Sequence, residues 1–289
     1  MHIWGHLAST GLAGHTAFVV ITDGSYQQIL DAIVTRTRSI VDCLRGLSDI
    51  ELHQLSELPD WSRLTILCHL RFGAEALSRM TIAAMAGQPV AYYPDGREAQ
   101  RARTLVPLVG EAPQDVVESL ALLSEELHVA WSALDAAAWS VDVLEPPGNR
   151  DLGVVPLGRL PLLRLTEVEI HGTDLGTNLD DWSEIFINTV LPMRLEWLNI
   201  RRANHRAFDT EIEGSWLLVA TDGPTYKVSV NGPNVESRPA IPHAPARAVI
   251  EATGRDLLAL LLGRAFHSPP VITGDVAFGR TFSRAFPGP

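Results

Sequence analysis

The sequence predicts a mainly α-helical protein that carries a small α+β domain at its C-terminal end. Apolar residues recur at helical spacing through most of the first 200 positions, and short strand-like apolar runs occur only beyond about residue 204. With 289 residues, 46% of them hydrophobic, the chain can bury a large core. We predict an N-terminal extension over residues 1–24, a helical domain over 25–203 and an α+β domain over 204–289.

Five amphipathic helices are predicted before residue 204, because apolar side chains recur every three or four positions and glycine or proline stands near the helix ends. They cover residues 26–47, 62–86, a stretch that follows Pro113, residues 162–175 and residues 182–202. The segment Gln88–Arg97 is rich in turn residues and is predicted to be a loop. A second loop is predicted at Pro146–Gly148.

The C-terminal part predicts strands. Residues 216–220 and 226–230 flank Asp222-Gly223-Pro224, which indicates a hairpin. A third strand is predicted over residues 248–252, and a helix over 255–262 that ends at Gly263. The Pro-rich segment Arg238–Pro245 is predicted to be a loop.

Composition excludes several classes of partner. The net charge is −11 and the 23 basic residues form no runs, so nucleic acid is not expected to bind. Only Cys43 and Cys68 are cysteines, which rules out a disulfide framework and favours a reducing cytoplasm. No stretch of about 18 apolar residues predicts a membrane span.

Residues 1–23 are interpreted as a disordered extension or an over-long start, with a signal peptide as the alternative. Lys227 is the only lysine and the other 22 basic residues are arginines, a bias typical of GC-rich bacterial genomes.

One helix carries a possible metal-binding pair. Glu167 and His171 are four residues apart, which stacks them on one helical face. Glu169 points elsewhere, and Asp174 can orient His171 through its other ring nitrogen. His69 is the best third ligand because its own helix is mostly apolar. The alternative is that this spacing arose by chance and that His69 is an ordinary core residue.

Other catalytic motifs are missing. The pair is not an H-E-x-x-H motif, so a zinc protease is not indicated, and no G-x-S-x-G, Walker or G-x-G-x-x-G sequence occurs.

A family resemblance strengthens the metal hypothesis. The segments that carry it are Leu58-Pro59-Asp60-Trp61, Leu67-Cys68-His69-Leu70, Gly87, Tyr93-Pro94-Asp95, Arg101, Arg164 through Gly176, and Asp181-Trp182. They resemble the N-terminal domain of mycothiol-dependent maleylpyruvate isomerases, which belong to the DinB-like four-helix-bundle superfamily. Residues 216–264 are similar to the sterol-carrier-like second domain of the same proteins.

The resemblance implies a zinc or other divalent ion bound by His69, Glu167 and His171. It also implies that Arg101 and Arg264 act in catalysis and, with Tyr93, hold substrate or thiol cofactor; the alternative is that the two arginines are helix caps or surface ion pairs. Tyr92 and Tyr93 could line a pocket, and the alternative is that they only cover the core. Cys68 is interpreted as a packed core residue and not as a nucleophile.

The function that follows is a zinc-dependent S-transferase or isomerase that uses mycothiol as co-substrate and acts on a small-molecule electrophile. Loops near Pro146 and Pro242–Pro245 exceed what a compact isomerase needs, which favours the general description over maleylpyruvate isomerase proper. A non-catalytic DinB-like ligand-binding protein and a metal-dependent hydrolase are the alternatives. We expect a cytoplasmic monomer or homodimer.

Overall fold

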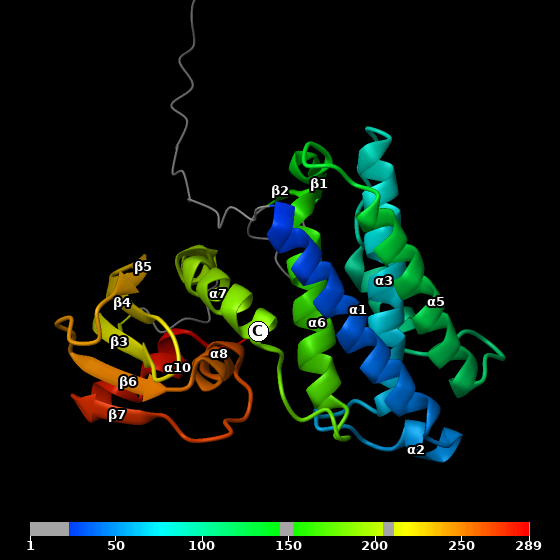
Figure 1. Cartoon of the computed structure of the whole chain (residues 1–289). Helices are drawn as coiled ribbons and strands as arrows, with labels where there is room; N and C mark the ends of the chain where they lie inside the picture. The colour runs from blue at the N-terminus through cyan, green and yellow to red at the C-terminus, as the bar shows by residue number, and fades with distance from the viewer. Residues whose placement is uncertain (1–22, 145–152, 205–210, 289) are drawn as a thin grey trace, which may run out of the picture.

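The structure is a computed structural model that describes residues 23–144, 153–204 and 211–288 (Figure 1). Residues 1–22 of the predicted N-terminal extension and the loop at Pro146–Gly148 therefore lie outside the described residues, and residues 23 and 24 of that extension belong to the first helix. In chain order the elements are α1 (Asp23–Arg45), α2 (Asp49–His53), α3 (Arg63–Met85), α4 (Arg97–Thr104), α5 (Pro113–Ser132), β1 (Asp142–Leu144), β2 (Val154–Pro156), α6 (Leu160–Asp174), α7 (Glu184–Asn204), β3 (Gly214–Ala220), β4 (Thr225–Asn231), β5 (Asn234–Ala240), β6 (Ala248–Ala252), α8 (Gly254–Leu262), β7 (Val271–Gly274), α9 (Val276–Gly279) and α10 (Phe282–Ala285).

Four long helices form the helical body. Helices α3 and α1 each pack against both α5 and α6, as Figure 1 shows. Each helix buries an apolar face, exemplified by Ile40, Leu67, Leu120 and Val168, all fully buried. Burying one such side chain contributes about 1.5–3 kcal/mol, so this packing fixes how α3 and α6 face each other.

The predicted helices are confirmed, and their ends have local causes. Ser62 caps α3 by accepting a hydrogen bond from the backbone N–H of Thr65. Pro161 lies in the first turn of α6, where its missing N–H costs no hydrogen bond. Helices α2 and α4 were not predicted. Both are short, and α4 has no buried residue. Neither therefore shows the repeated apolar residues at helical spacing on which the prediction depended.

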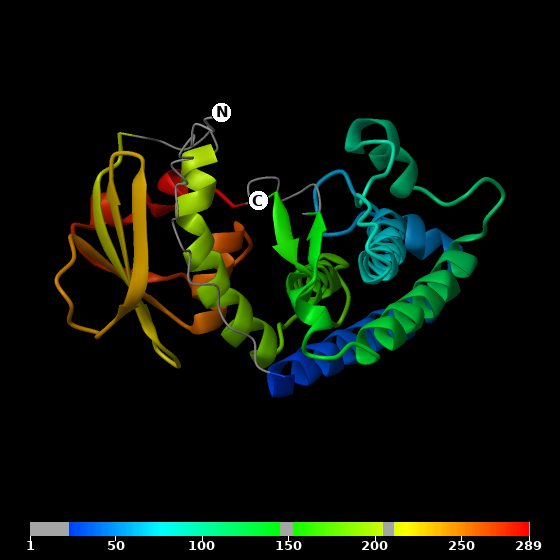
Figure 2. The ribbon, with the colours of Figure 1, turned by 90° about the horizontal axis from the view of Figure 1, so that it is seen from above.

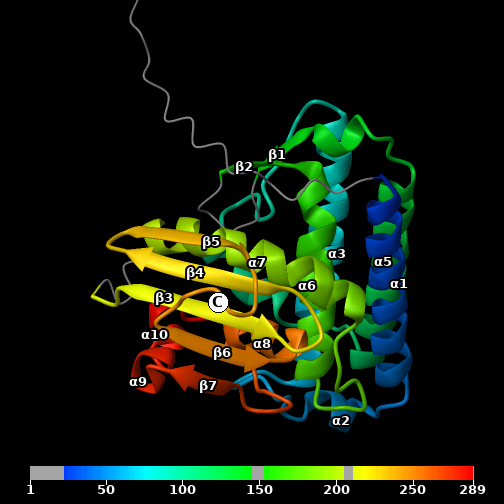
Figure 3. The same ribbon diagram turned by 60° about the vertical axis from the view of Figure 1, so that its left-hand side comes forward.

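The C-terminal part is a five-stranded sheet in the order β5-β4-β3-β6-β7 (Figure 3). The predicted hairpin is confirmed, since β3 and β4 pair antiparallel with Trp216 opposite Val228. Strand β6 runs parallel to β3 and antiparallel to β7. The central strand β3 buries Trp216, Leu217 and Leu218 in succession, which requires packing on both faces of the sheet.

The prediction of a loop over Arg238–Pro245 is wrong for its first three residues. Arg238, Pro239 and Ala240 belong to β5, which pairs with β4 at the edge of the sheet. An edge strand needs ladder hydrogen bonds on one side only, so Pro239 is tolerated there although it has no N–H.

Helices α7 and α8 lie between the sheet and the helical body (Figures 1 and 2). Helix α7 packs against β5 and α8 on one side and against α1 and α6 on the other. Because α7 contacts both parts, the boundary after residue 203 stays a prediction. Among the described residues, no helix is long and apolar enough to span a bilayer.

Candidate metal centre

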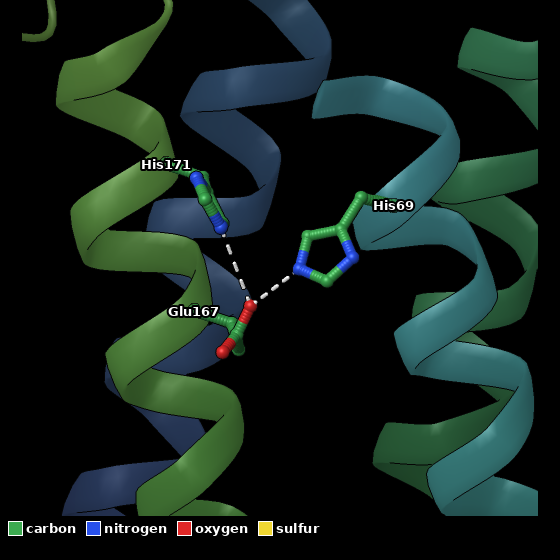
Figure 4. Close-up of side chains that lie close together, drawn as sticks. All are labelled: His69, Glu167 and His171. Atoms are coloured by element: carbon green, nitrogen blue, oxygen red, sulfur yellow. Dashed lines mark hydrogen bonds and ion pairs between the residues drawn. The ribbon is translucent and has the colours of Figure 1, made fainter. Parts of the chain in front are cut away.

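His69, Glu167 and His171 meet between α3 and α6. Helix α3 supplies His69, while Glu167 and His171 lie on successive turns of α6 and point toward it, as Figure 4 shows. The i, i+4 spacing places the two α6 side chains on one face, and the packing of α3 on α6 brings His69 opposite them.

Both imidazoles converge on one carboxylate oxygen. The Nε2 atom of His69 lies 2.7 Å from Oε2 of Glu167, and the Nε2 atom of His171 lies 3.4 Å from the same oxygen. One ligand atom from each of the three residues lies within 4.8 Å of the other two. The Glu167 side chain keeps 45% of its exposure, so the cluster opens toward solvent on the side of this carboxylate.

A chain of polar contacts continues behind His171. Its Nδ1 lies 3.0 Å from Oδ2 of Asp174, and Nη2 of Arg264 donates to the same oxygen at 3.2 Å. Gly263 ends α8 in the left-handed conformation, with φ of 64°, and this turn directs Arg264 toward α6. The C-terminal part of the chain is thereby connected to His171 through the Asp174 carboxylate.

Trp61 covers both imidazoles. Its ring stacks on His171 at 6.0 Å between centroids and meets His69 edge-on at 5.4 Å. Asp60, the one non-glycine residue with positive φ among the described residues, forms the turn just before it at φ of 66°. The Arg101 guanidinium lies 5.8 Å from the Trp61 ring centroid, a cation–π arrangement.

The three side chains differ in their charge. Loss of solvent disfavours charge on Glu167, but hydrogen bonds from His171 and His69 outweigh this and hold the pKa of the carboxyl well below its usual range. Burial lowers the pKa of His69 despite the neighbouring Glu167. Burial also opposes charge on His171, yet hydrogen bonds to Asp174 and Glu167 raise its pKa to about 9. An ionised carboxylate thus faces two imidazole nitrogens.

This donor set suits a divalent transition metal. Two imidazole nitrogens and one carboxylate oxygen are ligands that Zn²⁺ accepts, and three protein ligands leave a fourth position for a water or substrate. Within the described ranges, no other group of three His, Cys, Asp or Glu side chains could hold an ion in this way. The residues present therefore fit a catalytic metal.

The other predicted site residues lie at different distances from the cluster. Arg101, on α4, is near it through Trp61, and Arg264 reaches it through Asp174. The Tyr93 ring is buried and stacks on Phe72 at 5.2 Å. No contact between Tyr93 and the metal cluster is seen among the described side chains.

Two neighbouring residues follow their predicted assignments. Glu169 turns away from the cluster and accepts hydrogen bonds from Ser183. Cys68 is completely buried in the core, and burial raises the pKa of its thiol to about 11. Neither side chain is available as a ligand.

The sequence alone gave no role to Trp61, and it suggested for Tyr92 only that the ring could line a pocket or cover the core. Trp61 stands in the Leu58-Pro59-Asp60-Trp61 run that carried the family resemblance, so a signal for it was present. The hydroxyl of Tyr92 lies beside α3 near Gly73, and only the three-dimensional packing reveals this.

Comparisons with known proteins identify a matching family and similar folds. Residues 35–176 match the family model described as the mycothiol maleylpyruvate isomerase N-terminal domain. Two similar solved structures are crystal structures of the mycothiol-dependent maleylpyruvate isomerase, one of them a histidine-to-alanine mutant. Each is 20% identical, with TM-scores of 0.61 and 0.62, and the match covers 86% of this chain and 92% of the other. At this identity the likeness shows a shared fold. No curated protein gave a significant match.

Proposed function

This chain belongs to the mycothiol maleylpyruvate isomerase family through its N-terminal domain, and we propose that it is a metal-dependent enzyme that uses mycothiol as its thiol co-substrate. The observation that carries the proposal is the convergence of His69, Glu167 and His171 within 4.8 Å. Zinc is the ion we propose, because imidazole and carboxylate ligands in a three-residue set are typical of catalytic zinc.

Each residue around the site has a role in this proposal. A divalent ion bound there would act as a Lewis acid at which a thiol loses its proton near neutral pH. Asp174 accepts the Nδ1–H of His171, so Nε2 is the nitrogen that would lose its proton and bind the ion. Trp61 shields one side of both imidazoles from water. We assign Arg101 to a carboxylate of the electrophile or the thiol, since its guanidinium forms no ion pair with any described residue.

Cis–trans isomerisation of maleylpyruvate to fumarylpyruvate is the reaction we propose to test first, because it is the activity of the proteins named in the comparisons. The mycothiol thiolate would add to the cis double bond, the resulting single bond would rotate, and the thiolate would leave. S-transfer to another electrophile is the second candidate. At 20% identity the electrophile-binding residues can differ while the same three ligands serve both reactions.

Metal analysis and turnover test the proposal together. We expect about one zinc per chain and a mycothiol-dependent conversion of maleylpyruvate that chelation abolishes. His171→Ala should lose the metal, whereas His243→Ala, in an exposed loop between β5 and β6, should keep it. Thiol consumed in proportion to product would identify the transferase. Turnover without any low-molecular-weight thiol would identify a hydrolase and contradict the mechanism.

A non-catalytic DinB-like ligand-binding protein remains the alternative from another class. A carrier has no need of three metal ligands, so the cluster speaks against it. Folded protein that binds no zinc, cobalt or manganese would favour the carrier and contradict the enzyme.

We propose the finer fold assignment as well. The body of α1, α3, α5 and α6 fits a DinB-like bundle, and the sheet with α8 fits a sterol-carrier-like domain. A cytoplasmic location and a monomeric or homodimeric state stay predictions, which fractionation and light scattering can test.

A further inference from the structure

The hydroxyl of Tyr92 lies close to the metal centre and has no part in the mechanism above. This oxygen is 3.2 Å from the position that a Cβ atom on Gly73 would occupy, and Nη1 of Arg164 is 3.2 Å from the same point. Gly73 follows His69 by one turn of α3, and Arg164 precedes Glu167 by one turn of α6. The hydroxyl therefore stands one helical turn from the metal ligands, in space that the missing side chain of Gly73 leaves open.

The surrounding structure holds Tyr92 in place. Arg79 on α3 donates hydrogen bonds to the backbone oxygens of Ala91, at 3.0 Å, and Tyr92, at 3.1 Å. The Tyr92 ring meets Phe72 edge-on at 5.3 Å and Tyr93 edge-on at 5.0 Å. Backbone and ring are thus both fixed, which is the condition for a preorganised donor.

The hydroxyl is neutral and unengaged. It forms no hydrogen bond with the described part of the chain, and Tyr92 is only half-buried. Burial, followed by the negative charge of Glu167, raises the pKa of Tyr92, so this group donates a proton in hydrogen bonds and does not act as a base.

A buried cation lies beside this hydroxyl. The Arg164 guanidinium is 1% exposed and donates to the backbone oxygen of Leu70 at 2.8 Å and to Ser124 Oγ at 3.2 Å. Its Nε is buried without a partner, and no carboxylate of the described residues pairs with it. A fixed positive charge next to a neutral donor favours negative charge on any oxygen bound there.

We infer that Tyr92 donates a hydrogen bond to the electrophile's carbonyl or carboxylate oxygen on which negative charge develops during thiol addition. This inference rests on the proposed function. As the sulfur–carbon bond forms, the π pair of the carbon–carbon double bond moves onto the conjugated oxygen, giving an enolate. Tyr92 stabilises that oxygen and keeps its own proton. After rotation the pair returns, the double bond re-forms and the sulfur–carbon bond breaks.

The zinc-loaded Tyr92→Phe variant tests this inference, with mycothiol and maleylpyruvate as substrates. Loss of one such donor lowers kcat by about 10²-fold and raises KM by about fivefold at most, because the bond is strongest in the transition state. Calorimetry with maleate, in the absence of thiol, gives a readout besides activity. We expect its dissociation constant to rise about fivefold, as for loss of one hydrogen bond. Tyr226→Phe, in the C-terminal sheet, is the matched control and should leave both quantities unchanged.

Gly73→Ala provides a second variant that retains the hydroxyl. The new Cβ would stand 3.2 Å from both the Tyr92 oxygen and Arg164 Nη1, so these groups must shift. Alanine is the better helix former, and we therefore expect an unchanged or higher Tm together with a kcat lowered about tenfold. Falls in both stability and kcat would indicate general damage and contradict the inference.

Failure of the proposed function can be distinguished from failure of the inference about Tyr92. A parent enzyme that binds zinc yet converts no electrophile with mycothiol overturns the proposed function and this inference with it. An active parent whose Tyr92→Phe variant keeps kcat within about threefold overturns the inference alone, since a developing-charge contact costs more than that.

Discussion

The two sides of the candidate metal centre are built differently. On the α6 side, His171 is tied through Nδ1 to Asp174, which in turn accepts from Arg264 of the C-terminal part. On the α3 side, the Nδ1 atom of His69 is buried and finds no hydrogen-bond partner among the described residues. That ring is held by packing, with Trp61 edge-on at 5.4 Å.

This difference separates two ways of orienting a ligand. A hydrogen bond fixes which ring nitrogen of His171 carries the proton, whereas packing fixes only the plane of the His69 ring. The C-terminal part could influence an ion bound at the candidate site through α6 and not through α3. Substitution of the residues that contact His171 should therefore lower metal affinity more than substitution of those next to His69. Removal of either histidine itself should lower metal affinity equally.

Removal of either histidine should have the largest effect. In His69→Ala and His171→Ala we expect metal affinity to fall by more than the about 10–100-fold that loss of an outer partner costs. Metal content after dialysis, measured by mass spectrometry, checks this. A His69→Ala protein that keeps one tightly bound zinc would show that the α3 side supplies no ligand, and the comparison would fail.

Asp174→Asn should have the next largest effect. The substitution keeps the shape of the side chain but removes the charge that fixes His171, so we expect zinc affinity to fall about tenfold. Competition with a chelating dye measures it. Asp31→Asn, which alters only an exposed contact with Gln27, is the matched control. Equal affinities in the two variants would mean that packing orients both imidazoles.

Much of this site could be predicted because its central part is local in sequence. The i, i+4 and i, i+3 spacings of Glu167, His171 and Asp174 fix their shared face on any α-helix. His69 was the best third candidate because its helix is mostly apolar, but the family resemblance was needed to favour a ligand over an ordinary core residue, because spacing cannot show which helices pack together.

Long-range contacts explain what could not be predicted. Asp174 and Arg264 are 90 positions apart, and only the docking of α8 near α6 joins them. The Tyr92 hydroxyl lies beside α3 because Gly73 lacks a side chain, a fact of packing and not of periodicity. Strand β5 was missed because Pro239 is compatible with a strand only at a sheet edge, and edge position is a property of the whole sheet.

Arg264→Gln should have a smaller effect on the metal than Asp174→Asn, because Arg264 acts through that carboxylate. Its side chain is 27% exposed, and a partly exposed ion pair is worth about 1 kcal/mol or less, which corresponds to about fivefold or less in zinc affinity. The double variant should be non-additive, since both residues belong to one chain of contacts. A rise in KM for mycothiol far beyond this would show that Arg264 also contacts the thiol directly.

Cys68→Ala should have the smallest effect, because the thiol is next to His69 in sequence but about 100° away around α3. Zinc content and kcat should stay unchanged, while the cavity lowers stability by about 1 kcal/mol.

Burial raises the pKa of the Cys68 thiol to about 11, so below that pH it stays protonated and unreactive. At pH 8 a disulfide reagent should label only Cys43 in folded protein and both cysteines in urea, as a Cys43→Ala control would verify. Rapid labelling of Cys68, or loss of zinc in Cys68→Ala, would instead place a sulfur ligand on the α3 side and remove the asymmetry between the two helices.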